Sequence, residues 1–154
     1  MLPGDFLNAD AVALDLEAST RDDVLVAMVG LLRLPERSRT TLLRLLARRE
    51  LLGSTAVGRG IAIPHCRSLV VQRVRMAYAR LAKPMAWQSI DGEPVRHVFL
   101  IVAPPVEVSN QYLPTLGQLA RAARQPEFRV ALEQAGSPAE VAALLAGGHQ
   151  PPRA

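Results

Sequence analysis

The chain has 154 residues, a hydrophobic fraction of 49% and a net charge of +4, which describe one domain that can bury a core without metals or disulfides. No apolar run approaches the roughly 18 to 20 residues that span a bilayer, and no basic region precedes an apolar core at the N-terminus, so we expect neither membrane embedding nor a secretory signal. The lone Cys66 fits a cytoplasmic setting, and the scattered arginines do not interleave with aromatic residues, which argues against a nucleic-acid partner.

The first part of the chain predicts a strand and then a helix. Residues 11–16 alternate in hydropathy, as a half-buried strand does. Thr20 and Asp23 stand at the spacing of a capping box, with aspartate in place of the usual Glu or Gln. The helix that follows is expected to end at Pro35. Its core-facing positions would be Val24, Leu25, Met28, Leu31 and Leu32.

A second helix is expected from about residue 38 to residue 52, with Gly53 as its stop. Arg48 and Arg49 lie in its last turn, where positive charge complements the carbonyl end of a helix. This dipole contact is the structural interpretation of both arginines. The buried face of the helix would be formed by Leu42, Leu45, Leu46 and Leu52.

A short apolar run then leads to a histidine. Residues 61–63 alternate as a strand buried on at least one side. Pro64 has no N–H to give to a sheet, so we expect it to end strand pairing and to project His65 from the end of the sheet, at an edge that ligands reach.

Two glycines lie just before this run. Gly58 and Gly60 frame a turn, and because glycine leaves backbone N–H groups uncovered, the turn is a candidate anion cradle. Ser54 and Thr55 precede it with a pair of hydroxyl groups.

The middle of the chain predicts two longer strands. Residues 74–81 alternate as a strand with one buried face, closed by Pro84, and the pair at 91–92 is an Asp-Gly turn signal. Residues 95–102 are almost continuously apolar, as in a central strand covered on both faces. His97 lies inside that strand, and we interpret it as a core histidine with a satisfied hydrogen bond.

Three helices are expected at the end of the chain. Ser109 can cap the first, a short second helix runs from residue 126 to about residue 134, and Ser137 caps the third. His149 falls in a frayed tail and is not expected to be functional. The apolar stripe of the first of these helices would be Leu113, Leu116, Leu119, Ala120 and Ala123.

The order of these elements predicts the fold class. Strands that alternate with helices, followed by three helices, indicate an α/β fold with a mixed β-sheet flanked by helices. We expect a single domain over residues 1–148 and a disordered tail over residues 149–154.

The segment from Arg49 to His65 resembles a family signature. It contains Arg-Glu, then Ser-Thr, then Gly-x-Gly-Ile-Ala-Ile-Pro-His, and a second block follows at residues 91–104. Both blocks resemble the enzyme IIA domains of the bacterial phosphoenolpyruvate-dependent phosphotransferase system, of the fructose/mannitol type (type 2) that includes the nitrogen-regulatory proteins. The resemblance covers most of residues 10–147.

The resemblance implies a phosphoryl carrier. His65 would accept the phosphoryl group from the phosphocarrier protein HPr or its nitrogen-branch paralogue, and a IIB component or a regulatory target would come next. Near pH 7 a neutral imidazole nitrogen keeps the lone pair that this step needs. Arg49, in its functional interpretation, would support the phosphorylated histidine. No cofactor or metal is implied. Further contacts to the phosphoryl group would come from Ser54, Thr55 and the backbone of Gly58 and Gly60.

One position departs from the family pattern. Where relatives have a second histidine that helps handle the phosphoryl group, this chain has Tyr112. A tyrosine hydroxyl can donate one hydrogen bond but does not become a cation near neutral pH.

Three functions therefore stay open at this point. The first is a phosphoryl carrier, with a regulatory role favoured because no IIB or IIC segment follows in the sequence. The second is a regulatory module of the same fold that binds a partner without transfer. The third is an unrelated α/β enzyme in which His65 is an acid or base. Whether the chain is an enzyme is left undecided.

Overall fold

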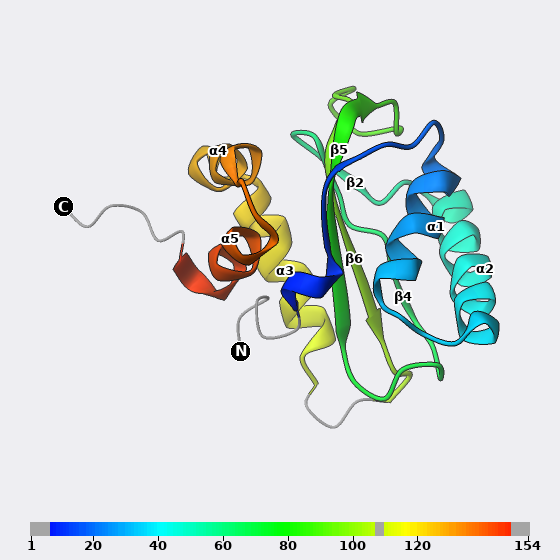
Figure 1. The fold of residues 1–154 in the computed structure, drawn as a ribbon. Coiled ribbons are helices and arrows are strands. Elements are labelled where there is room, and N and C mark those ends of the chain that lie inside the picture. The colour runs from blue at the N-terminus through cyan, green and yellow to red at the C-terminus, as the bar shows by residue number, and fades with distance from the viewer. Residues whose placement is uncertain (1–6, 107–109, 149–154) are drawn as a thin grey trace.

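The computed structural model describes residues 7–106 and 110–148, and its centre is a six-stranded sheet with helices on both faces (Figure 1). The strands are β1 (Val12–Leu16), β2 (Ala56–Gly58), β3 (Ile61–Ala62), β4 (His65–Arg67), β5 (Arg75–Met85) and β6 (Val95–Ala103). β5 and β6 pair antiparallel in the middle, β1 runs parallel to β5, and both β3 and β4 run parallel to β6. The predicted mixed sheet is confirmed.

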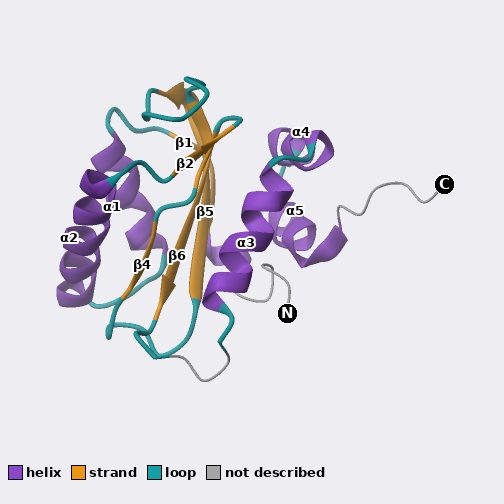
Figure 2. Cartoon of the chain, turned by 180° about the vertical axis from the view of Figure 1, so that it is seen from behind, coloured by secondary structure: helices purple, strands orange, loops and turns teal. Residues whose placement is uncertain are grey.

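The helices form two layers. α1 (Arg21–Leu31) and α2 (Glu36–Leu52) cover one face of the sheet. α3 (Tyr112–Ala123), α4 (Pro126–Gln134) and α5 (Pro138–Ala143) cover the other, as the reverse view in Figure 2 also shows. Two short helices, η2 (Ala9–Ala11) and η3 (Leu144–Gly148), precede β1 and follow α5. Within the described residues, no helix combines the length and apolarity needed to cross a membrane.

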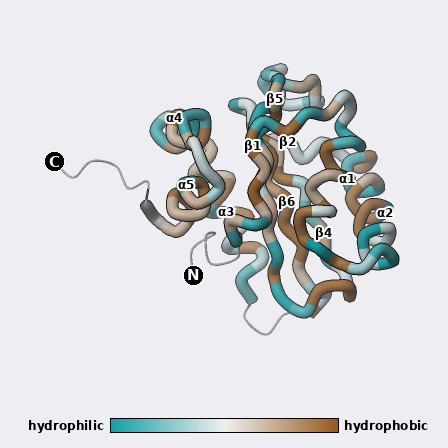
Figure 3. The backbone as a smooth tube through the Cα atoms, viewed as in Figure 1, coloured by the Kyte–Doolittle hydropathy of each residue, from teal (hydrophilic) through white to brown (hydrophobic). Residues whose placement is uncertain are grey.

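The core lies along the two central strands. β6 is hydrophobic along most of its length in Figure 3, and residues 97–103 are all buried. The Phe99 ring lies 4.8 Å from that of Tyr78 and 6.2 Å from that of Phe128 on α4, measured between centroids, which joins the sheet to the second helical layer. Aromatic pairs at these separations add to the burial of apolar area.

β5 differs from its prediction. Only one buried face was expected, yet residues 76–81 are all buried, because β5 lies between β1 and β6 with helices on both faces. The strand also continues past Pro84 to Met85. Proline is tolerated where the partner register shifts, and the pairing with β6 skips from Arg80 to Met85.

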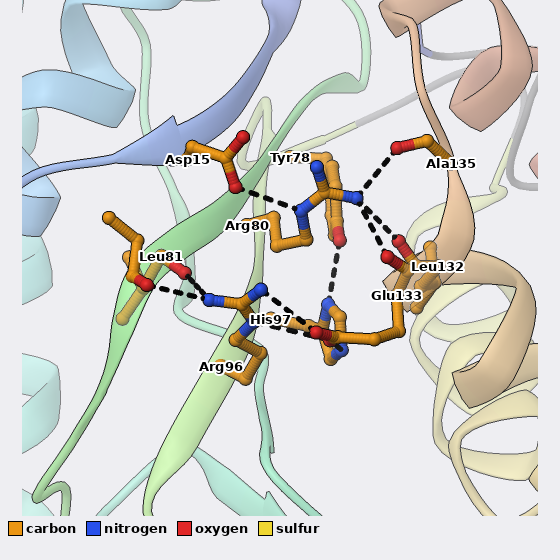
Figure 4. A network of polar contacts seen from close by, with 10 residues as sticks. Asp15, Tyr78, Arg80, Leu81, Arg96, His97, Leu132, Glu133 and Ala135 are labelled. Atoms are coloured by element: carbon orange, nitrogen blue, oxygen red, sulfur yellow. Dashed lines mark hydrogen bonds and ion pairs between the residues drawn. The ribbon is translucent and has the colours of Figure 1, made fainter.

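The buried Arg80 of β5 ties the sheet to the end of α4 (Figure 4). Its Nη1 donates to the carbonyl oxygens of Leu132, Glu133 and Ala135 at 3.0, 3.2 and 2.7 Å. These carbonyls belong to the last turn of α4 and to its C-cap, where a helix leaves its carbonyl groups without partners within the helix. Arg96 of β6 adds a two-pronged ion pair to the Glu133 carboxylate, at 2.8 and 3.1 Å.

The start of α1 follows the sequence closely. The Thr20 hydroxyl accepts from the N–H of Asp23 at 3.1 Å, as predicted. The Asp23 carboxylate, however, accepts from the N–H of Ser19 rather than that of Thr20. The helix ends at Leu31, ahead of the predicted stop at Pro35, which instead stands at the N-cap of α2.

The buried face of α2 was predicted incorrectly at one end. Leu42 and Leu46 are buried as expected, but Leu45 is only half-buried and Leu52 is 82% exposed. The third buried position is Glu50, which continues the spacing of four residues. Leu52 lies two residues beyond Glu50, about 200° around the helix, and therefore faces solvent.

The later helices begin near their predicted positions. Ser137 caps α5 by accepting from the N–H of Glu140 at 3.2 Å. Gln111 occupies the N-cap of α3. The predicted cap Ser109 and the predicted tail, residues 149–154 with His149, lie outside the described residues.

Candidate functional site

A hollow of about 200 Å³ lies at the edge of the sheet, where the end of α2 approaches α3. It brings together four of the residues singled out in the sequence, namely Arg49, Ser54, Thr55 and His65. Its remaining lining is apolar and comes from Val57, Ile63, Leu116 and Ala120.

His65 does not project from the end of the sheet, which corrects the expectation for Pro64. The carbonyl of Pro64 accepts from the N–H of Ile101, and His65 is paired with Ile101 at the start of β4. Strand pairing to β6 thus resumes directly after Pro64, because a proline lacks only the N–H and its carbonyl can still accept from β6. The imidazole does lie at a sheet edge, since no strand is described on the other side of β4.

The ring of His65 is oriented by the backbone two residues before it. Nδ1 lies 2.6 Å from the carbonyl oxygen of Ile63. A carbonyl can only accept, so this hydrogen bond requires the proton on Nδ1, and in the neutral ring the lone pair is then on Nε2. Nε2 is therefore the nitrogen available for chemistry.

Arg49 makes the contact with the carbonyl end of its helix that its structural interpretation predicts. Its Nη1 donates to the carbonyl oxygen of Gly53 at 2.8 Å, just beyond the end of α2. The same side chain lines the hollow beside His65. Because a guanidinium has several N–H donors, one bond to Gly53 leaves others for a ligand, and the two interpretations are compatible.

Glu50 is a buried carboxylate that the sequence analysis missed. It accepts from the N–H and the hydroxyl of Thr55, and from Nε1–H of Trp87 at 3.4 Å. The Arg21 guanidinium lies 3.9 Å from it. A charged residue four positions after Leu46 on the apolar stripe was the signal that could have revealed it.

The two hydroxyl groups of the site are not equivalent. Thr55 has a single hydroxyl proton and donates it to Glu50. The Ser54 hydroxyl accepts from the N–H of Ala56 at 3.1 Å and keeps its own proton available. Ser54 is thus the better placed of the two to donate to an anion.

The structure brings Tyr112 to His65. Their ring centroids are 6.2 Å apart with a tilt of 60°. Arg67, which the sequence analysis did not consider, contacts Tyr112: its guanidinium carbon lies 4.4 Å from the centre of the Tyr112 ring.

The structure does not bring Gly58 and Gly60 into the hollow. They flank the turn between β2 and β3, where Arg59 and Gly60 have φ values of 59° and 79°. The N–H of Arg59 donates to the Asp91 carboxylate at 2.7 Å, so this donor already has an anionic partner. Ile61 pairs with His97 and His65 with Ile101, which places the turn several residues along β6 from the imidazole. A phosphoryl-binding role for the two glycines remains a prediction.

His97 has the features of a core histidine. It is buried, its Nδ1 lies 2.7 Å from the Tyr78 hydroxyl, and its Nε2 lies 3.5 Å from Glu133 (Figure 4). Burial lowers the pKa of His97 to about 4.

Cys66 has the features of an inert thiol. Burial raises the pKa of Cys66 to about 12, so it stays protonated. The described part of the chain contains no group of three or more His, Cys, Asp or Glu residues arranged to hold a metal ion.

Comparison with known proteins points to one family. Residues 5–147 match the family model of the phosphoenolpyruvate-dependent sugar phosphotransferase system, EIIA 2. The chain is 32% identical, over 92% of its length, to the 2-O-alpha-mannosyl-D-glycerate-specific EIIABC component of Escherichia coli K12, of which it spans 22%. It is 36% identical, over 66% of its length, to a nitrogen regulatory protein of Bradyrhizobium diazoefficiens, of which it spans 65%.

Solved structures agree with that match. The crystal structure of nitrogen regulatory protein IIA-Ntr from Neisseria meningitidis superposes with a TM-score of 0.84 and 31% identity, covering 92% of this chain and 97% of that one. The IIA mannitol structure from Escherichia coli superposes with a TM-score of 0.72 at 20% identity, covering 90% of this chain and 98% of that one, which supports the fold alone. The chain therefore belongs to the EIIA 2 family of the phosphoenolpyruvate-dependent sugar phosphotransferase system.

Proposed function

We propose that this protein is a phosphoryl carrier that accepts a phosphoryl group on Nε2 of His65. The observation that carries the proposal is the 2.6 Å contact between Nδ1 of His65 and the Ile63 carbonyl, which leaves Nε2 unprotonated beside a hollow that also contains Arg49. The donor would be the phosphocarrier protein HPr or its nitrogen-branch paralogue, in the cytoplasm.

The transfer needs no proton to be removed from His65. The Nε2 lone pair forms a bond to phosphorus while the bond from phosphorus to the donor histidine breaks, and the donor imidazole leaves with that electron pair. The His65 ring keeps its Nδ1 proton and takes on positive charge. The hydrogen bond to the Ile63 carbonyl strengthens as this charge develops, so it favours the product and the transition state over the neutral ring.

The lining of the hollow suits the charge on the transferred group. Phosphoryl transfer spreads negative charge over three equatorial oxygens, and the protein mainly has to place donors around them. Arg49 and the Ser54 hydroxyl would supply these donors. Thr55 would act indirectly, because its hydroxyl is held by Glu50 while its carbonyl accepts from the N–H of Ile63 at 2.9 Å.

A regulatory role is favoured over sugar uptake. Nitrogen regulatory proteins are among the relatives at 36% identity, and one provides the similar structure with a TM-score of 0.84. The mannosylglycerate component at 32% identity keeps uptake open as the alternative. For uptake the next acceptor would be a IIB component, as in the complex of IIA mannitol with phosphorylated IIB.

A second candidate is a module that binds its partner without transfer. It is favoured by one observation, the presence of Tyr112 beside His65 where the family pattern has a histidine. Both candidates use the same hollow, and they differ in whether a covalent phosphohistidine forms.

One experiment separates them. The protein is incubated with phosphoenolpyruvate, enzyme I and the phosphocarrier protein, and its intact mass is measured. We expect a gain of one phosphoryl group that is lost in acid and absent in His65→Ala. His97→Gln is the matched control and should keep the gain. No gain in the wild-type protein would favour the binding module, and a gain that persists in His65→Ala would place the site elsewhere.

A further inference from the structure

Arg67 and His65 lie on the same side of one strand. They occupy the first and third positions of β4, which pair with Ile101 and Ala103 of β6. Side chains two residues apart in a strand point to the same face. Tyr112, at the first position of α3, is only 5% exposed and lies against both.

The guanidinium of Arg67 is held in place from two directions. The guanidinium carbon lies 4.4 Å from the centre of the Tyr112 ring, a distance at which the negative face of the ring attracts a cation. Its Nη1 donates to the carbonyl oxygen of Pro104 at 3.0 Å. An exposed arginine would otherwise sample many rotamers, so these two contacts keep its charge near one place.

Tyr112 connects the positive charge of Arg67 with the ring of His65. Its ring contacts Arg67 and lies 6.2 Å from the ring of His65, so the three side chains form a row along the end of α3. A phosphoryl group on His65 would bring roughly two negative charges to this row. Arg49 is the cation on the α2 side of the hollow, and Arg67 is the cation that lies over the Tyr112 ring.

We propose that Arg67 is a positioning residue for phosphoryl transfer, supplying a permanent positive charge beside His65, and that Tyr112 holds it there. This inference rests on the proposed phosphoryl-carrier function. Arg67 and Tyr112 together would place a positive charge beside His65, as a protonated histidine at position 112 would do alone. The difference is that a guanidinium is always charged, whereas a histidine loses its charge near neutral pH.

The test uses two phosphoryl donors, the phosphocarrier protein and phosphoramidate. With phosphoramidate the phosphorus–nitrogen bond of the reagent breaks, ammonia leaves and phosphorus bonds to Nε2 of His65. A small donor makes no protein–protein contact, so an effect seen with it comes from the site itself. Phosphorylation rates are followed by intact mass, and melting temperature is measured for every variant.

We expect Arg67→Gln to slow phosphorylation at least about fivefold with both donors, at an unchanged melting temperature. Arg67→Lys keeps the charge and the contact with the ring, and should recover part of the loss. Tyr112→Leu removes the ring, and its loss should not add to that of Arg67→Gln in the double variant, because both act through one guanidinium.

Lys83→Gln is the matched control. It removes one exposed positive charge near the end of β5 that pairs with Val95, whereas Arg67 pairs at the opposite end of β6. Its rate should equal that of the wild type.

Three results would overturn the inference. They are an unchanged rate in Arg67→Gln, a loss with the phosphocarrier protein but not with phosphoramidate, and additive losses in the double variant. If wild-type His65 accepts a phosphoryl group from neither donor, the proposed function itself is wrong and this inference fails with it. That outcome can be distinguished from the three results above, because it is seen with the wild-type protein before any variant is tested.

Discussion

The carboxylate of Glu50 accepts hydrogen bonds from both the backbone N–H and the hydroxyl of Thr55. A residue in the last turns of α2 thereby fixes the segment that leads to β2. The carbonyl of Thr55 accepts from the N–H of Ile63, and the carbonyl of Ile63 in turn contacts Nδ1 of His65. The buried Glu50 carboxylate is therefore connected to His65 through Thr55 and Ile63. The shape of the hollow depends on this chain of contacts.

Glu50→Ala is expected to destabilise the fold. It would leave buried donors on Thr55 and Trp87 without an acceptor, and such losses cost about 2 to 4 kcal/mol. Urea denaturation measures the change in the free energy of unfolding. Glu36→Ala, at the exposed first turn of the same helix, is the control and should change it by less than about 1 kcal/mol. Equal effects in the two variants would contradict the role of Glu50.

Ser54 and Thr55 should respond differently to removal of their hydroxyl groups. Ser54→Ala removes an available donor from the hollow and should slow phosphorylation of His65 about tenfold or less, with little change in stability. Thr55→Val removes one of the hydrogen bonds to the buried Glu50 carboxylate and should lower the melting temperature more than Ser54→Ala does. Rates come from intact mass and melting temperatures from circular dichroism. A larger rate loss in Thr55→Val at unchanged stability would reverse the assignment.

Arg49→Ala should slow phosphorylation by at least about tenfold, corresponding to the roughly 1.4 kcal/mol expected of a charge-assisted contact in the transition state. Its melting temperature should change little, because only the bond to the Gly53 carbonyl at the helix end is lost. Arg48→Ala removes an exposed neighbour from the same turn and serves as control. A large fall in melting temperature with an unchanged rate would support the purely structural interpretation.

The local patterns of the sequence predicted the fold well. The caps at Thr20 and Ser137 are determined by residues close in sequence, and the structure confirms them. The alternation of hydropathy over residues 74–81 predicted one buried face, whereas β5 is buried on both, because burial also depends on strands and helices far along the chain. The orienting partner of His65 could not be predicted, because it is a backbone carbonyl, which every residue carries. The contact between Arg67 and Tyr112 joins a strand to a helix far along the chain, and only the tertiary structure reveals it.

The buried His97 predicts a pH dependence of stability. Burial lowers the pKa of His97 from 6.5 to about 4 in the folded state, while the unfolded chain keeps the ordinary value. The unfolded state therefore binds more protons between these values, so stability is complete above about pH 6.5 and falls as the pH drops towards 4. The loss is of the order of 3 kcal/mol at most.

Urea denaturation at several pH values measures this dependence. His97→Gln removes the titrating ring and should flatten the curve between pH 6.5 and pH 4. His65→Gln, which replaces a half-buried ring, is the comparison, and a flattening seen in His97→Gln but not in it assigns the slope to His97. If both variants keep the wild-type slope, another group is responsible.

The last prediction concerns the position of the second family histidine. Tyr112→His places a titratable ring beside His65, in the position now held by the tyrosine ring at 6.2 Å. A histidine with a pKa near 6.5 becomes about five times more protonated as the pH falls from 7.5 to 6.5, and the protonated ring attracts the incoming phosphoryl group. The variant also loses the ring that holds Arg67, at every pH, so we expect the rate of Tyr112→His relative to the wild type to rise as the pH falls from 7.5 to 6.5. The quantity to compare is the ratio of the two rates at each pH, because a pH effect that is common to both proteins cancels in it. Tyr112→Phe shows whether the native hydroxyl contributes, since a fall in rate would mean that it donates to the phosphoryl group. A ratio near one at both pH values would show that position 112 does not take over the role of the family histidine, even though the structure places it beside His65.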